Sequence, residues 1–132
     1  HVLSDDEISA FFNEIDSYSP EIKAPPFLRL STEYKVIFRL IYCCGLRISE
    51  ARKLKWSDAD LEAGTLKIMQ SKGHKDRLIY MSEDLVVLMK EYDGTEDHHG
   101  CVSEWVFPAR EPGNCLCSVT INAAFRRAWN AT

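Results

Sequence analysis

Apolar residues recur at helical spacing near the start of the chain. Ser4 followed by Glu7 is the pattern of a capping box, in which two side chains satisfy free backbone N–H groups at a helix N-terminus. The apolar positions that follow repeat every three or four residues, at Ile8, Phe11, Phe12 and Ile15. This period predicts an amphipathic helix over residues 5–17.

A segment with several prolines separates this helix from the next one. Residues 18–30 contain three prolines, and we expect them to form a loop because proline lacks the N–H that a helix interior uses. A second helix is predicted from Thr32 to Cys44, with Gly45 just after its end. A short third helix is predicted over residues 48–55. Its inward positions are Ile48, Ala51 and Leu54.

The hydrophobic period changes from helical spacing to alternation in the middle of the chain. Thr65–Gln70 and Arg77–Met81 are two short runs that favour β-structure, and the six residues between them are polar with one glycine. This arrangement predicts a β-hairpin with a basic tip.

Two further helices are predicted after the hairpin. Ser82 is expected to cap a helix that ends at Gly94 and has an apolar stripe of Leu85, Leu88, Met89 and Tyr92. A last helix is predicted over residues 118–130, with Ile121, Phe125 and Ala128 on its inner side. The fold class is therefore α+β, mostly helical with a small antiparallel hairpin or three-stranded sheet.

The length and composition fit one soluble domain. The chain has 132 residues, of which 45% are hydrophobic, and no apolar run approaches the roughly 20 residues that span a bilayer. The acidic N-terminal segment lacks the pattern of a signal peptide. We therefore expect a cytoplasmic protein without a membrane segment.

The cysteines indicate a reducing compartment and no metal. There are five of them at irregular spacing, and Cys43 and Cys44 lie in an apolar stretch where free cysteine behaves as a small hydrophobe. Cys115 and Cys117 are spaced more tightly than the usual pair of zinc ligands. A zinc site formed with the upstream His98, His99 and Cys101 stays the less favoured alternative to free thiols and histidines on a loop.

The charge is unevenly distributed. The whole chain carries a net −4, but residues 39–77 hold nine basic and five acidic residues, and the remainder carries −8. The basic middle could bind phosphate, and a solvated charged face is the alternative.

Two features in this basic region are suited to phosphate chemistry. In Gly45-Leu46-Arg47-Ile48-Ser49-Glu50 an arginine follows a helix-ending glycine, and a carboxylate three residues later could orient it. Lys72, Lys75 and Arg77 lie on the hairpin. An arginine fork can grip two phosphate oxygens, and a lysine adds a charge that carries a proton.

Residues 40–85 resemble the catalytic domain of the tyrosine recombinases, or phage integrases. That family shows an apolar helix, the run Gly-Leu-Arg-x-Ser-Glu, a Trp-x-Asp turn, and a hairpin with Lys-Gly-x-Lys-x-Arg. Here these are the 45–50 hexapeptide, Trp56-Ser57-Asp58, and Lys72 to Arg77. The first helix and the stretch from Val106 onward fit as well, so the resemblance covers nearly the whole chain.

The resemblance implies a role for each matching residue. Arg47 would bind the scissile phosphate, and Lys72 would be the general acid toward the leaving 5′-hydroxyl. Glu50 matches the acidic position that supports the arginine. Lys75 and Arg77 are expected to contact the DNA backbone. Each position has a plain structural alternative: Arg47 as a residue near a helix end, and the others as solvated or salt-bridged charges.

The resemblance also implies what the protein acts on. The full-length protein would cut and rejoin double-stranded DNA at a recombination site through a 3′-phosphotyrosine, as a homotetramer, and without metal, nucleotide or other cofactor. The family's second motif, His-x-Leu-Arg-His and then a nucleophilic tyrosine, does not occur after Lys72. Residues 1–132 are therefore expected to be part of a catalytic domain, without the N-terminal core-binding domain, and inactive alone.

Two alternative functions remain open from the sequence. One is a DNA-binding remnant of an integrase that has lost catalysis. The other is an unrelated helical protein-interaction domain.

Overall fold

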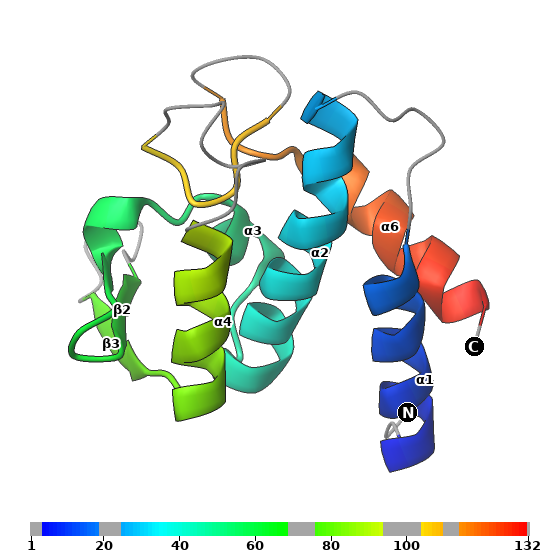
Figure 1. The fold of residues 1–132 in the computed structure, drawn as a ribbon, viewed down its shortest axis with the longest axis horizontal. Coiled ribbons are helices and arrows are strands. Elements are labelled where there is room, and N and C mark those ends of the chain that lie inside the picture. Colours follow the sequence, from blue (N-terminus) through cyan, green and yellow to red (C-terminus); the bar gives the residue numbers. More distant parts are fainter. Residues whose placement is uncertain (1–3, 19–24, 69–75, 94–103, 110–113, 132) are drawn as a thin grey trace.

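The central element of the fold is helix α2 (Pro25–Cys44), which lies between two groups of elements (Figure 1). On one side are α4 (Glu83–Asp93) and a small sheet, and on the other are α1 (Asp5–Ser17) and α6 (Ser118–Asn130). The structure is a computed structural model, and it describes residues 4–18, 25–68, 76–93, 104–109 and 114–131. The arrangement confirms the α+β fold class.

Helix α1 begins as the sequence predicts. The Glu7 backbone N–H donates to Ser4 Oγ at 3.1 Å, and the Ser4 N–H donates to Glu7 Oε1 at 3.1 Å. Both halves of the capping box are therefore present, and they satisfy two N–H groups that the first turn leaves free. Phe11 and Ile15 are buried on the inner face of this helix.

The expected start of the second helix was wrong. Residues 18–30 were expected to form a loop, but α2 already begins at Pro25. Proline is compatible with the first turn of a helix because the N–H that it lacks would have no partner there, and its fixed φ suits the helix. None of the helices in the described part of the chain is both long and apolar enough to cross a membrane.

Helix α2 supplies the middle of the hydrophobic core. Val36, Ile37 and Leu40 are completely buried, which reflects packing against helices on both sides. The helix ends at Gly45, whose φ of +67° is the left-handed conformation in which helices often stop.

The sheet has three antiparallel strands in the order β1-β2-β3, so the hairpin is confirmed and gains a short edge strand. The strands are β1 (Ala59–Asp60), β2 (Thr65–Ile68) and β3 (Arg77–Tyr80). Leu66 pairs with Ile79, and Ile68 pairs with Arg77. Leu66 and Ile68 alternate with exposed or half-buried neighbours and are buried, so β2 presents one apolar face to the core.

The segment around Trp105 ties α4 to the turn before the sheet. The short helix α3 (Ile48–Arg52) and a 3-10 turn (Trp56–Asp58) precede the sheet. Val106 N–H donates to the Leu54 carbonyl at 2.9 Å, and the Tyr92 hydroxyl of α4 donates to the Val106 carbonyl.

Ser82 caps α4 as predicted, because its Oγ accepts from the Leu85 N–H at 3.2 Å.

Two expectations about burial were wrong. Phe125 was placed on the inner side of α6, but it is 45% exposed and Ala124 takes the buried position between Ile121 and Ala128. Cys43 and Cys44 were expected to behave as small hydrophobes, but Cys43 is exposed and Cys44 is only half-buried. In both helices the neighbouring elements decide which side of a broad apolar face is covered.

Candidate functional site

Arg47 projects from a sharp turn between two helices. Gly45 ends α2, Leu46 is buried, and Arg47 is the extended N-cap residue of α3, with φ −72° and ψ 153°. Leu46 and Ala51 anchor the turn in the core on either side of the arginine. The backbone is therefore held in place while the guanidinium is exposed to solvent.

The guanidinium of Arg47 has no hydrogen-bond or ion-pair partner among the residues that the structure describes. An arginine side chain carries five N–H donors in a planar fork. Near a helix junction these donors can take a phosphate group in the bidentate geometry that guanidinium favours. Arg47 is thus an exposed cation at the surface, on a backbone that the turn holds in place, with its side-chain donors free in the described part of the chain.

Glu50 lies at the centre of this site and contacts two arginines. Its Oε1 accepts from the Arg47 backbone N–H at 2.9 Å and from Arg77 Nη2 at 3.1 Å. The Glu50 side chain is 12% exposed, so the ion pair is largely withdrawn from water on the carboxylate side. Glu50 therefore contacts Arg47 through the backbone N–H only, and the Arg47 guanidinium stays free within the described part of the chain.

Arg77 connects the hairpin to this site. It is the first residue of β3 and pairs with Ile68 of β2, while its guanidinium reaches Glu50 on α3. The structure therefore brings Arg47, Glu50 and Arg77 together. Lys72 and Lys75 fall between β2 and β3 in the sequence and lie outside the described residues.

The remaining basic residues near the site differ in how they are paired. The Nζ atom of Lys55 lies 3.6 Å from Glu104 Oε2, and the Nζ atom of Lys67 lies 3.5 Å from Asp76 Oδ2. Both contacts are at least partly exposed, so they neutralise charge without holding the side chains firmly. Arg47 keeps its charge unpaired within the described part of the chain.

Arg52 is a residue whose role the sequence did not reveal. Its Nη1 donates to the Leu116 carbonyl at 3.3 Å and contacts Cys115 Sγ at 3.6 Å. The contact joins α3, which carries Glu50, to the segment that leads into α6. Because the partners are more than 60 residues apart, no local pattern could have indicated it.

The cysteines near α6 are free thiols in the described structure. A hydrogen bond between Cys117 Sγ and Thr120 Oγ1, at 3.1 Å, lowers the pKa of the Cys117 thiol. Within the described ranges no group of three or more His, Cys, Asp or Glu side chains could hold a metal ion. The other candidate zinc ligands, His98, His99 and Cys101, lie outside these ranges.

Comparison with known proteins agrees with this architecture. The profile of the phage integrase family matches residues 1–132. An integrase/recombinase of Sinorhizobium fredii is 28% identical over 127 residues, which are 96% of this chain and 35% of that protein. The tyrosine recombinase XerC of Xanthomonas campestris is 30% identical over 92 residues, covering 70% of this chain and 28% of the relative. The chain thus spans about a third of the length of these relatives.

Solved structures show the same fold. The crystal structure of XerH recombinase in a pre-cleavage complex with its difH substrate superposes with a TM-score of 0.75 at 22% identity, covering 97% of this chain and 35% of that one. The XerA recombinase superposes with a TM-score of 0.73 at 21% identity, covering 99% and 42%. The match over all 132 residues, together with the turn that carries Arg47, shows that this chain belongs to the phage integrase family.

Proposed function

We propose that this chain is the part of a tyrosine recombinase catalytic domain that binds the scissile phosphate. The observation that carries the proposal is the exposed guanidinium of Arg47, whose backbone N–H is held by the Glu50–Arg77 cluster while its side-chain donors have no partner in the described part of the chain. Preorganised cations that face a phosphoryl group stabilise the charge of its transition state. The family to which the chain belongs supports the same assignment.

In this proposal the full-length protein cuts and rejoins DNA at a specific site. A tyrosine hydroxyl gives its proton to solvent as its oxygen bonds to the phosphorus, and the bond from phosphorus to the 5′-oxygen breaks. Arg47 stabilises the charge on the non-bridging oxygens, and Lys72 gives its proton to the leaving 5′-oxygen. The products are a 3′-phosphotyrosine and a free 5′-hydroxyl, and the reverse steps rejoin the strands. Glu50 positions the site, and Lys75 and Arg77 contact backbone phosphates.

The proposal extends to assembly. The full-length protein acts on double-stranded DNA as a homotetramer, and it needs neither a metal nor a nucleotide because the phosphotyrosine conserves the bond energy. The 132-residue chain alone does not cleave DNA. Tyr34 and Tyr92 are buried and cannot reach a DNA phosphate, and the exposed Tyr42 and Tyr80 precede the position at which the family places its nucleophile.

DNA binding of the chain tests the phosphate contact directly. We expect Arg47→Ala to weaken binding to duplex DNA at least about tenfold, since a charge-assisted hydrogen bond contributes about 1.5–3 kcal/mol. The slope of log K against log salt should fall by about 1. Lys90→Ala on α4 is the matched control and should leave both quantities unchanged. Equal losses in the two variants would contradict the proposal.

Catalysis is tested in the full-length protein with a DNA substrate that carries a nick beside the cleavage site. A covalent protein–DNA adduct should form, and it should be lost in Arg47→Lys, which keeps the charge but not the planar fork. DNA binding without any adduct in the wild-type protein would favour the alternative of a non-catalytic DNA-binding remnant. An adduct formed by the 132-residue chain would refute its proposed inactivity.

A further inference from the structure

The carboxylate of Glu50 reaches back to the residue that carries the free guanidinium. Glu50 occupies the third position of α3, and its Oε1 accepts from the backbone N–H of Arg47 at 2.9 Å. Side chains three residues apart on a helix are neighbours. The carboxylate is therefore within reach of the Arg47 guanidinium. An ion pair between these two side chains would take up the donors that Arg47 needs for a phosphate.

The structure pairs this carboxylate with Arg77 instead. Oε1 of Glu50 accepts from Arg77 Nη2 at 3.1 Å, and no ion pair joins Glu50 to the Arg47 side chain in the described part of the chain. The Glu50 side chain is 12% exposed. A carboxylate so far withdrawn from water needs a cation beside it, because removing one partner of such a pair leaves a charge that water screens poorly.

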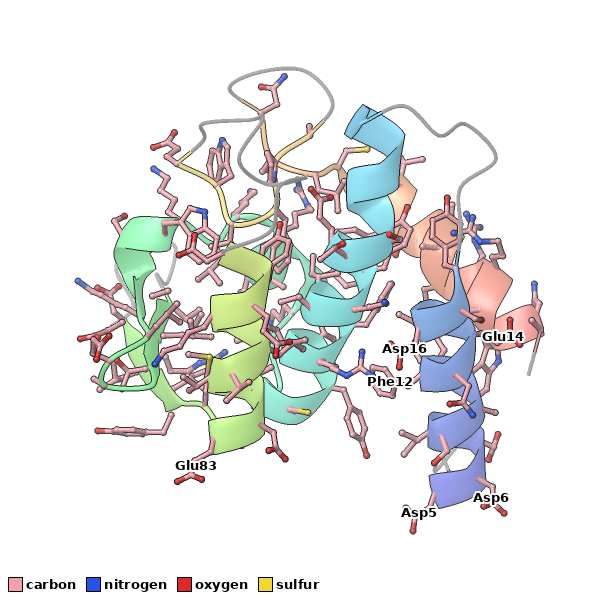
Figure 2. All side chains as sticks on the ribbon, viewed as in Figure 1. Asp5, Asp6, Phe12, Glu14, Asp16 and Glu83 are labelled. Atoms are coloured by element: carbon pink, nitrogen blue, oxygen red, sulfur yellow. The ribbon has the colours of Figure 1, made fainter. Side chains whose placement is uncertain are left out.

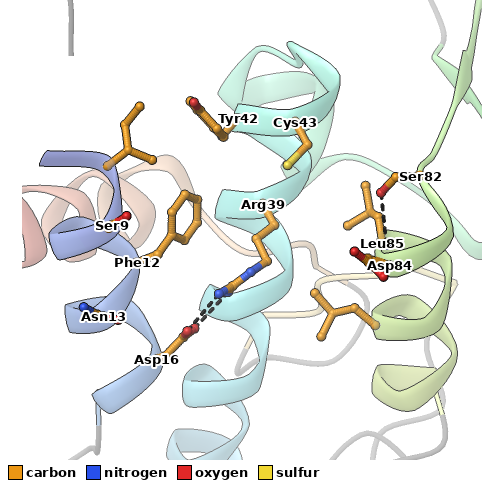
Figure 3. Close-up of a pocket in the computed structure, with 12 residues that line it drawn as sticks. Ser9, Phe12, Asn13, Asp16, Arg39, Tyr42, Cys43, Ser82, Asp84 and Leu85 are labelled. Carbon is orange, nitrogen blue, oxygen red and sulfur yellow. Dashed lines mark hydrogen bonds and ion pairs between the residues drawn. The ribbon is translucent and has the colours of Figure 1, made fainter. Parts of the chain in front are cut away.

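Arg39 and Asp16 form the kind of ion pair that Arg47 and Glu50 avoid. Asp16 lies on α1, which contains no basic residue, and Figure 2 shows it on the side of this helix toward α2. Each of its two oxygens is bonded by one Nη atom of Arg39 at 2.8 Å, as the dashed lines in Figure 3 show. A carboxylate with no basic residue on its own helix thus takes both Nη atoms of an arginine on the neighbouring one.

The other basic residues described on α3 and the sheet differ from Arg47 in position or in partner. Lys53 lies at the C-terminal end of α3, whereas the Glu50 carboxylate is bonded at the N-terminal end. Arg52 donates to a backbone carbonyl before α6, and Lys67 has an acidic partner of its own. If its present partner were removed, Glu50 would therefore turn to the Arg47 guanidinium among the described cations.

We infer that Arg77 is a positioning residue: by occupying the Glu50 carboxylate, it keeps the Arg47 guanidinium free for a DNA phosphate. The inference rests on the proposed function, in which Arg47 binds that phosphate. One Nη atom of Arg77 makes the contact with Glu50, and a guanidinium has five N–H donors, so the same side chain can also contact a backbone phosphate. Because Arg77 is the first residue of β3, the freedom of Arg47 depends on the hairpin lying against α3.

The contribution of Arg47 to DNA binding, measured in three backgrounds of the 132-residue chain, tests this inference. Arg47→Ala should weaken duplex binding at least about tenfold in the wild-type background. In the Arg77→Ala background it should weaken binding no more than about twofold, because Glu50 already holds the guanidinium there. Adding Glu50→Gln to Arg77→Ala should restore the large effect, since the amide is uncharged and keeps an oxygen for the Arg47 N–H. A simple loss of positive charge predicts the same factor in all three backgrounds.

Lys67→Ala is the matched control for Arg77→Ala. Lys67 lies on the neighbouring strand β2 with its Nζ 3.5 Å from Asp76 Oδ2, so this variant also removes a cation from a carboxylate. In its background Arg47→Ala should keep its full effect. Arg77→Lys should behave like the wild type, because the contact uses a single Nη atom that an ammonium group can replace. Urea unfolding verifies that each variant is folded.

A measurement without DNA separates this inference from the proposed function. The Nε–H signal of Arg47 in the NMR spectrum of the isotope-labelled chain should shift in Arg77→Ala and return when Glu50→Gln is added. An unmoved signal would overturn the inference, and so would an equal measurable loss of affinity on Arg47→Ala in the wild-type and Arg77→Ala backgrounds. A shifted signal with no loss of affinity on Arg47→Ala in the wild type would support the role of Arg77 and contradict phosphate binding by Arg47.

Discussion

Glu50 and Arg77 are joined across 27 positions of sequence by one carboxylate oxygen that also caps α3. Oε1 of Glu50 accepts from Arg77 Nη2 at 3.1 Å and from the Arg47 N–H at 2.9 Å. The hairpin and the arginine turn are therefore in direct contact through this carboxylate. A phosphate held by Arg47 would lie beside strand β3 because of this contact.

The strength of this contact can be measured with a double-mutant cycle. Combining Glu50→Gln with Arg77→Ala should give a coupling energy of about 0.5–1 kcal/mol in urea unfolding, because the Glu50 side chain is only 12% exposed. Lys67 and Asp76 form the control pair at 3.5 Å, with side chains 55% and 33% exposed. Their coupling should be close to zero. A Glu50–Arg77 coupling no larger than the control would show that the contact is incidental.

Glycine should be needed at position 45 because of its backbone conformation, and not because a side chain there would clash with a neighbour. Its φ is +67°, and a Cβ added there would meet nothing within 4 Å. We expect Gly45→Ala to destabilise the protein by about 1–2 kcal/mol through left-handed strain alone. Gly45→Asn should lose less stability, since asparagine tolerates this conformation. Equal losses in the two variants, measured by urea unfolding, would point to a packing effect instead.

The core position Leu40 should be among the most sensitive in the protein. It is completely buried in the middle of α2, so Leu40→Ala should destabilise by about 3–5 kcal/mol through lost burial and the cavity that remains. Val87→Ala on the exposed face of α4 is the control, with a change within about 0.5 kcal/mol. Thermal or urea unfolding compares the two. A loss below about 1 kcal/mol at Leu40 would contradict the central position of α2.

Tyr34 should make the protein less stable in alkali. Burial, followed by the nearby Tyr18, raises the pKa of Tyr34 to about 12 from an ordinary 10.0. Between these two values the unfolded chain loses the phenolic proton while the folded protein keeps it, so stability falls as the pH rises. The loss should approach roughly 2–3 kcal/mol by pH 12.

Substitution separates this effect from the other groups that titrate in alkali. Tyr34→Phe should remove that part of the pH dependence, whereas Tyr42→Phe, at a side chain that is 55% exposed, should not. The measurement is the urea midpoint of each variant at pH 8 and pH 11. Parallel pH profiles for wild type and Tyr34→Phe would refute the assignment.

Cys117 should be the more reactive thiol when compared with Cys44. The hydrogen bond with Thr120 lowers the pKa of Cys117, while burial raises the pKa of Cys44. Because the thiolate is the nucleophile, alkylation by iodoacetamide should reach half its maximal rate below pH 9 at Cys117 and above pH 9 at Cys44.

Thr120→Val tests the cause of this reactivity. Without the hydroxyl, the pH midpoint of Cys117 alkylation should rise, and that of Cys44 should not move. Mass spectrometry of the alkylated peptides follows both sites in one sample. An unchanged Cys117 midpoint would mean that Thr120 does not stabilise the thiolate.

The sequence by itself determined the features that depend on near neighbours. The capping box of Ser4, the end of α2 at Gly45, the hairpin and the cap of α4 at Ser82 all follow from residues within a few positions of one another. Local hydrogen bonds and hydrophobic periods suffice for these elements. The position of Arg47 at a turn also follows, because Gly45 comes just before it.

Only the tertiary structure decided which groups meet and which faces are covered. The exposure of Phe125 and the burial of Ala124 depend on which elements pack against α6 rather than on the sequence of α6 itself. The contacts Glu50–Arg77 and Asp16–Arg39 join residues more than 20 positions apart. Such contacts arise from the packing of whole elements, and a pattern read over a few turns of one element carries no information about them.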